Sequence, residues 1–247
     1  MAELPLHEAF VPTDPGSRAL SADEVHVWAV PLTGEAEPFA ALLSAAEQDR
    51  VQRFRFADHQ RRYQIGHGAL RRILGGYLGK DPEAVEFRQG PRGKPYLEGQ
   101  DAGSGPFFNL SHSGQLAVIA VATTELGVDI EKVRRLESLN QIAERHFSNT
   151  EFRELDQLEG SDRELAFYRC WTRKEAYIKA LGEGLSLALD SFDVSLCEEP
   201  KFLACHDGRE NLSSWSLVDV SPGPEFVGAI AMRHGGPTVH RHRLAGA

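Results

Sequence analysis

The sequence of 247 residues lacks several features that would restrict its function class. No apolar run approaches the ~20 residues of a transmembrane helix, and the longest run, at 116–122, is typical of a buried strand. Residues 1–20 hold acids and prolines where a secretion signal has an apolar segment. The three cysteines, Cys170, Cys197 and Cys205, form no CxxC pair, which argues against a disulfide framework and against a zinc site. We therefore expect a cytoplasmic protein with reduced thiols and no membrane contact.

Acidic residues outnumber basic ones over the whole chain, but basic residues are concentrated in one segment. The formal net charge of −9 disfavours nucleic-acid binding. Residues 50–72 nevertheless contain seven arginines and a single acid, Asp58. An acidic protein with one basic segment is expected to bind a small anion, although solvated helix faces would give the same pattern.

The sequence repeats itself once. The capping-box pattern Ser-x-x-Glu occurs at 44–47 and again, 104 residues later, at 148–151. Helical periodicity over 59–78 stops at Gly79, and the same periodicity over 162–181 stops at Gly182. Strand-like segments correspond in the same way, with 25–30, 84–88 and 107–123 matching 127–133, 191–196 and 213–232.

These matches predict an α+β fold built as a pseudo-twofold tandem of two similar halves. We expect residues 1–124 and 125–247 to form the N-terminal and C-terminal halves, each a small antiparallel sheet packed by helices. A cleft between two such halves is a common place for a ligand site.

Two carboxylates lie on one face of the predicted strand Gly127-Val-Asp-Ile-Glu131. Residues i and i+2 of a strand face the same side, so Asp129 and Glu131 project together. A hard divalent cation would relieve their mutual repulsion, whereas at a solvent-facing edge they would be ordinary acids.

A third acid belongs to the predicted helix that contains Trp171. Glu175 and Lys179 are four residues apart and share one helix face. Glu175 would complete a metal site begun by the strand, with Lys179 facing the bound anion. The alternative is an exposed ion pair of small energy.

Two turn segments add polar groups. In Phe108-Asn-Leu-Ser-His-Ser-Gly114, His112 lies at a strand end where it would donate to a phosphate, or serve only a structural role. The loop Gly90-Pro-Arg-Gly-Lys-Pro-Tyr96 presents Arg92 and Lys94 but does not have the order of a P-loop.

Together these motifs resemble the phosphopantetheinyl transferase superfamily, in its surfactin-synthetase-activating (Sfp-like) type. The similarity covers about residues 43–189 and includes Asn-Leu-Ser-His-Ser at 109–113 and Gly-Lys-Pro at 93–95. Its signature is carried here by Gly127, Asp129, Glu131, Trp171, Lys174, Glu175 and Lys179.

The resemblance implies a single-chain, pseudo-dimeric enzyme that transfers the phosphopantetheine arm of coenzyme A. The acceptor would be a serine of an acyl, peptidyl or aryl carrier protein, and the by-product adenosine 3′,5′-bisphosphate. Asp129, Glu131 and Glu175 would bind Mg²⁺, and Lys179 and His112 would contact the pyrophosphate. The resemblance assigns the remaining coenzyme phosphate contacts to Arg50, Arg62 and Lys94, beside Ser111. Tyr63 replaces a small hydroxylic residue that is frequent in relatives.

A serine hydroxyl is a weak nucleophile and needs a base, and we expect Glu175 to accept its proton. Two other functions use the same residues. A Mg²⁺-dependent phosphodiesterase would need the same three acids, and a non-catalytic coenzyme A-binding protein would bind without turnover.

Overall fold

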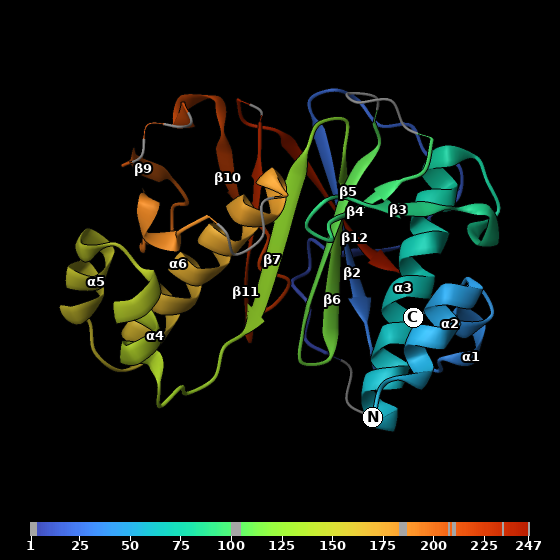
Figure 1. Cartoon of the computed structure of the whole chain (residues 1–247), viewed down its shortest axis with the longest axis horizontal. Coiled ribbons are helices and arrows are strands. Elements are labelled where there is room, and N and C mark those ends of the chain that lie inside the picture. The colour runs from blue at the N-terminus through green and yellow to red at the C-terminus, as the bar shows by residue number, and fades with distance from the viewer. Residues whose placement is uncertain are drawn as a thin grey trace.

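A computed structural model describes residues 4–99, 105–182, 187–206, 208, 211–233 and 235–246. It has the predicted α+β architecture, with two main sheets side by side and the longest helices, α3 and α6, on their outer faces (Figure 1). Two further two-stranded sheets are formed by β3 with β4 and by β8 with β9. Among the described residues, no helix combines the length and the apolar character that a membrane span requires. The three cysteines are free.

The elements follow the order of the chain. The first half contains β1 (Val11–Thr13), β2 (Glu24–Pro31), α1 (Glu37–Ala40), α2 (Ala45–Gln52), α3 (Ala57–Leu78), a 3₁₀ turn (Pro82–Ala84), β3 (Phe87–Gln89), β4 (Pro95–Leu97), β5 (Phe107–Ser113) and β6 (Leu116–Ala122). The second contains β7 (Leu126–Lys132), α4 (Leu139–His146), α5 (Asn149–Asp156), α6 (Gly160–Leu181), a 3₁₀ turn (Leu189–Ser191), β8 (Phe192–Val194), β9 (Phe202–Cys205), another 3₁₀ turn (Leu212–Ser214), β10 (Ser216–Asp219), β11 (Phe226–Met232) and β12 (Thr238–Leu244).

The last strand crosses the expected boundary between the halves. The larger sheet has the order β1-β12-β2-β6-β5 and the smaller one β10-β11-β7. The division at residue 124 assigns β12 to the C-terminal half, whereas the structure pairs β12 in parallel with β2 and β1 of the N-terminal half. The first sheet is therefore mixed and not purely antiparallel as expected.

The repeat predicted from sequence is visible in matched local structure. Ser44 and Ser148 each cap a helix through a complete capping box with Glu47 and Glu151. Helices α3 and α6 are both 22 residues long, and each ends at a glycine in the left-handed conformation, Gly79 and Gly182. Glycine adopts that conformation without strain, which is why both helices stop where the sequence predicts.

Each capping-box glutamate also holds a buried cation from the long helix of its own half. Arg71 donates to Glu47 at 2.7 Å, and Lys174 lies 2.8 Å from Glu151. Both cations donate further to main-chain carbonyls of the segment after the helix, Arg71 to Val85 and Lys174 to Leu189. Each half is therefore stabilised internally by the same arrangement. A buried ion pair joins the long helix to the helix cap and to the segment that follows the helix.

Three apolar clusters fill the spaces between these layers. One lies between α3 and the larger sheet, a second between α6 and the smaller sheet, and a third between the two sheets. Strand β6 is buried along its whole length because its alternate residues face the first and third clusters. The apolar layer between the sheets holds the two halves against each other.

Replacing Lys174 with methionine tests the buried pair. Lys174 and Glu151 have side-chain exposures of 0% and 1%, so the substitution leaves a buried carboxylate without its cation. Loss of one partner of a buried pair costs about 3–5 kcal/mol of unfolding free energy, which urea denaturation will measure. Glu225→Gln, which breaks the exposed pair between Lys132 and Glu225, should change stability by less than about 1 kcal/mol. Equal losses in the two variants would contradict this account.

Candidate functional site

The two sheets meet at a seam between β5 and β7 that is made by side chains. Asn109 Oδ1 accepts the Val128 amide at 2.9 Å, and Ser113 Oγ accepts the Lys132 amide at 3.0 Å. Ser111 Oγ lies 3.4 Å from the Ile130 amide between them. The partners advance in the same direction along both strands, so β5 and β7 run parallel. Polar side chains of β5 thus pair the buried amides at the edge of β7.

The serines of this seam also hold the carboxylates. Ser111 donates to Asp129 Oδ1 at 2.8 Å, and Ser113 donates to Glu131 Oε2 at 2.7 Å. Val128 and Ile130 are buried in the apolar layer between the sheets. The strand alternation predicted from sequence is therefore present, and it turns both acids away from that layer.

Gly127 lets helix α6 approach the acids closely. A Cβ atom at this position would collide with backbone atoms of Ala176 and Ala180 in α6. Because glycine has no side chain, the helix lies directly on β7 and carries Glu175 and Lys179 to the strand. The glycine of the strand motif is thus required by the helix contact.

Lys179 links the helix to the seam. Its Nζ lies 2.6 Å from Asp129 Oδ1 and donates to Ser111 Oγ at 3.1 Å. The ammonium group neutralises part of the acid cluster from one side, while Asp129 Oδ2 is buried without a hydrogen-bond partner. An unpaired buried carboxylate oxygen is costly unless a further cation or donor meets it.

The surroundings of the acid cluster disfavour the charged form of its glutamates. Desolvation raises the pKa of Glu131; the hydrogen bond from Ser113 opposes this shift, and the charge of Asp129 adds to it. Desolvation and then the charge of Asp129 also raise the pKa of Glu175. Three desolvated carboxylates with one ammonium group and an unpartnered oxygen fit a hard divalent cation such as Mg²⁺.

The three acids nevertheless do not close into a compact metal-ligand set. Among the described residues, the group that brings three ligand atoms within 4.8 Å of one another is Glu24, His26 and His240, and the acid cluster does not meet that distance. The Lys179 ammonium lies against Asp129 in this conformation. Binding a cation between the acids therefore needs a rearrangement of these side chains, and the assignment of the three ligands stays a prediction.

The cluster opens into a cavity of about 780 Å³ that both halves line. The predicted site residues on its wall are Arg50, Ser111, His112, Asp129, Glu131, Glu175 and Lys179. His67, whose ring stacks on Tyr63 at 3.9 Å, and His146 also line the wall, and no motif in the sequence indicated either of them. The spacing of Tyr63 and His67, one helical turn apart, was the available signal.

Two predicted phosphate contacts lie in adjoining hollows. Arg62 lines a hollow of about 220 Å³ together with His112, and it is paired with Asp58. Lys94 lines one of about 280 Å³ with Glu175 and Lys179.

Lys94 also braces the two halves. Its ammonium donates to the carbonyls of Leu126 and Ala180, and desolvation lowers its pKa to about 8. Two of its three protons are thus directed at the main chain of the other half. Contact between Lys94 and a phosphate stays a prediction, and only the third proton of the ammonium group is left to make it.

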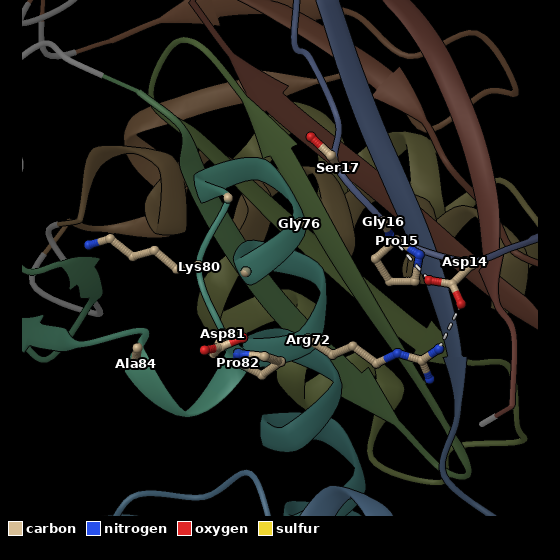
Figure 2. A pocket seen from close by; sticks show the side chains of 12 residues that line it. Asp14, Pro15, Gly16, Ser17, Arg72, Gly76, Lys80, Asp81, Pro82 and Ala84 are labelled. Carbon is tan, nitrogen blue, oxygen red and sulfur yellow. Dashed lines mark hydrogen bonds and ion pairs between the residues drawn. The ribbon is translucent and has the colours of Figure 1, made fainter.

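A second large hollow, of about 660 Å³, lies at the far end of α3 (Figure 2). Arg72 points toward Asp14 across it and pairs with that carboxylate at 3.2 Å, and it also donates to the Ala245 carbonyl. The side chain of Asp14 in this hollow is exposed, whereas Glu131 and Glu175 at the seam are desolvated. The cavity at the seam, with its desolvated acids, is the better candidate site.

A tandem α+β chain with a carboxylate and lysine cluster in the cavity between its halves has the donor set of an enzyme that handles phosphate esters. The model of the 4′-phosphopantetheinyl transferase superfamily matches residues 125–231, and that of 4′-phosphopantetheinyl transferase, N-terminal, matches residues 27–124. The 4′-phosphopantetheinyl transferase HetI of Nostoc sp. is 40% identical over 232 residues, 92% of this chain and 94% of its own.

Two Bacillus subtilis proteins are also similar. A 4′-phosphopantetheinyl transferase is 33% identical over 81% of this chain and 91% of its own length. The 4′-phosphopantetheinyl transferase Sfp of strain 168 is 34% identical over 67% of this chain and 71% of its own. The chain belongs to the 4′-phosphopantetheinyl transferase superfamily, and it is a transferase, as the sequence motifs predicted.

Gly127→Ala tests the helix contact. The added methyl group must push α6 away from β7, and a displacement of about 1 Å at a catalytic group costs on the order of 100-fold in rate. We expect a loss of transferase activity of that size, with about 1–3 kcal/mol of stability lost through overpacking. Gly235→Ala, where a Cβ meets nothing within 4 Å, is the control and should leave both unchanged. A fully active Gly127→Ala protein would show that α6 need not touch the strand.

Proposed function

We propose that this protein transfers the 4′-phosphopantetheine arm of coenzyme A to a serine of an acyl or peptidyl carrier protein, with Mg²⁺ as cofactor. The observation that carries the proposal is the cluster of Asp129, Glu131, Glu175 and Lys179 on the wall of a 780 Å³ cavity. Adenosine 3′,5′-bisphosphate would be the second product. Membership of the family supports the reaction class, and the donor, the acceptor and the metal are parts of the proposal.

The cavity offers charges suited to a pyrophosphate. Asp129, Glu131 and Glu175 would hold Mg²⁺, which when bound neutralises phosphate oxygens and stabilises charge on the leaving group. Lys179 extends from the helix to the acids and is placed to contact the same anion. Arg50 also lines the cavity, with its guanidinium 5.8 Å from the ring centre of Tyr63.

His112 would act as a hydrogen-bond partner. Desolvation by the walls and then the charge of Lys179 lower the pKa of its ring. A neutral imidazole at neutral pH binds a phosphate oxygen through its N–H group, without adding a full positive charge. Arg50, Arg62, Lys94 and Lys179 would then supply the cationic contacts.

Glu175 is suited to accept the serine proton. The carrier hydroxyl oxygen would form a bond to the phosphorus on the pantetheine side, while the bond from that phosphorus to the bridging oxygen breaks. The serine proton passes to Glu175, and the electron pair leaves with the adenosine bisphosphate, whose charge Lys179 stabilises. Desolvation and the nearby Asp129 raise the pKa of Glu175, which makes its carboxylate a stronger base than a solvated one.

Intact mass spectrometry of an apo acyl carrier protein tests the proposal. With coenzyme A and Mg²⁺ the carrier should gain the mass of one phosphopantetheine arm, and a chelator should stop the reaction. Glu175→Gln should lower turnover by about 10²–10⁴-fold, as expected for loss of a general base, while coenzyme binding measured by calorimetry largely survives. Asp129→Ala should remove both activity and its magnesium dependence.

The control variant is Glu225→Gln, which removes an exposed carboxylate near β7 and should react at the wild-type rate. A fully active Asp129→Ala protein would remove the metal assignment. Cleavage of coenzyme A without a mass gain on the carrier would identify a phosphodiesterase and overturn the proposed transfer.

A further inference from the structure

A second cluster of potential metal ligands lies on the larger sheet, outside the cavity at the seam. Glu24 and His26 are two residues apart on β2, so they share one face of the sheet. His240 of β12 lies directly opposite His26 in the register of the two parallel strands. Among the described residues, these three form the group whose ligand atoms all lie within 4.8 Å of one another.

The spacing within this cluster fits metal ligands better than direct hydrogen bonds. His26 Nε2 lies 3.5 Å from one carboxylate oxygen of Glu24, and His240 Nε2 lies 3.4 Å from the other. Hydrogen bonds from ring nitrogen to oxygen are usually about 2.7–3.2 Å long. Ligand atoms bound tetrahedrally to zinc at about 2.0–2.1 Å are separated by about 3.4 Å.

The surroundings fix His26 in the orientation that a metal ligand needs. His26 is 6% exposed, and its Nδ1 lies 2.6 Å from the Tyr77 hydroxyl, which also accepts the Trp28 indole N–H at 3.1 Å. A metal-binding histidine usually has such a partner on its other ring nitrogen. The Nε2 atom is thereby directed at Glu24.

The ring nitrogen of His240 that faces Glu24 is otherwise unused. His240 Nε2 is buried and has no hydrogen-bond partner among the described residues, although the remainder of that side chain is partly exposed. A buried polar atom without a partner is rare and points to a missing ligand. The partly exposed side chains of Glu24 and His240 leave a route by which an ion enters.

We propose that Glu24, His26 and His240 bind a divalent transition metal, with zinc as the best fit to two imidazoles and one carboxylate. The fourth position is open to water. The ion would join β12, from the end of the chain, to β2 in the N-terminal half, and so clamp the strand that crosses between the halves. The cysteine pattern argued against zinc, and this site uses no cysteine.

Calorimetric titration of the full chain with Zn²⁺, after treatment with a chelator and in the presence of excess Mg²⁺, tests the site. Wild type should bind one Zn²⁺ ion and gain thermal stability with it, because the ion binds only the folded form. His240→Gln and Glu24→Gln should each weaken binding at least tenfold. Both positions are partly exposed, so these variants should fold.

Two controls separate this site from other metal-binding positions. His206→Gln removes a histidine that pairs with Asp193 elsewhere and should bind Zn²⁺ like wild type. Asp129→Asn alters the acid cluster and should also bind Zn²⁺ like wild type. Unchanged affinity in His240→Gln and Glu24→Gln, or no stoichiometric binding by wild type, would overturn the site. Zinc binding that is lost only in Asp129→Asn would assign the ion to the cavity instead.

Discussion

The structure depends on the way β7 is joined to β5. The amides on this edge of β7 are buried between the halves, and buried N–H groups require partners. Asn109, Ser111 and Ser113 supply them with side-chain oxygens, and the two serines also donate to Asp129 and Glu131. The contact that joins the two halves is therefore the same contact that positions the acids. A tandem fold of this kind cannot separate its halves without dismantling its site.

The duplication has produced two different polar clusters at related positions. Helices α3 and α6 begin at residues 57 and 160, an offset of 103. At that offset His26 corresponds to Asp129, and each faces the long helix of its own half. The C-terminal half places a carboxylate and Lys179 there, which suits a hard cation and a phosphate. The N-terminal half places His26 against Tyr77, with Glu24 and His240 beside it, which suits a softer metal.

Local signals in the sequence predicted much of this fold. Both capping boxes, both glycine helix stops and the alternation of Asp129 and Glu131 against Val128 and Ile130 follow from rules that span a few residues. The assignment of β12 to the sheet of the C-terminal half was wrong, because parallel pairing with a strand more than 200 residues away leaves no local pattern in the sequence. The buried pair of Lys174 and Glu151 was not predicted either, since its stability depends on burial that only packing creates. The ligand roles in the acid cluster stay predictions, because Glu175 of α6 meets Asp129 and Glu131 of β7 only through packing, which leaves no local pattern in the sequence.

Calorimetric titration with coenzyme A, in the presence and absence of Mg²⁺, tests most directly whether the acid cluster binds a cation that grips the coenzyme. If it does, Mg²⁺ must strengthen coenzyme binding by the same factor by which the coenzyme strengthens Mg²⁺ binding. We predict that Mg²⁺ tightens coenzyme binding at least tenfold in the wild-type protein and has no effect in Asp129→Asn. An Asp129→Asn protein that retained the full magnesium effect would contradict the account.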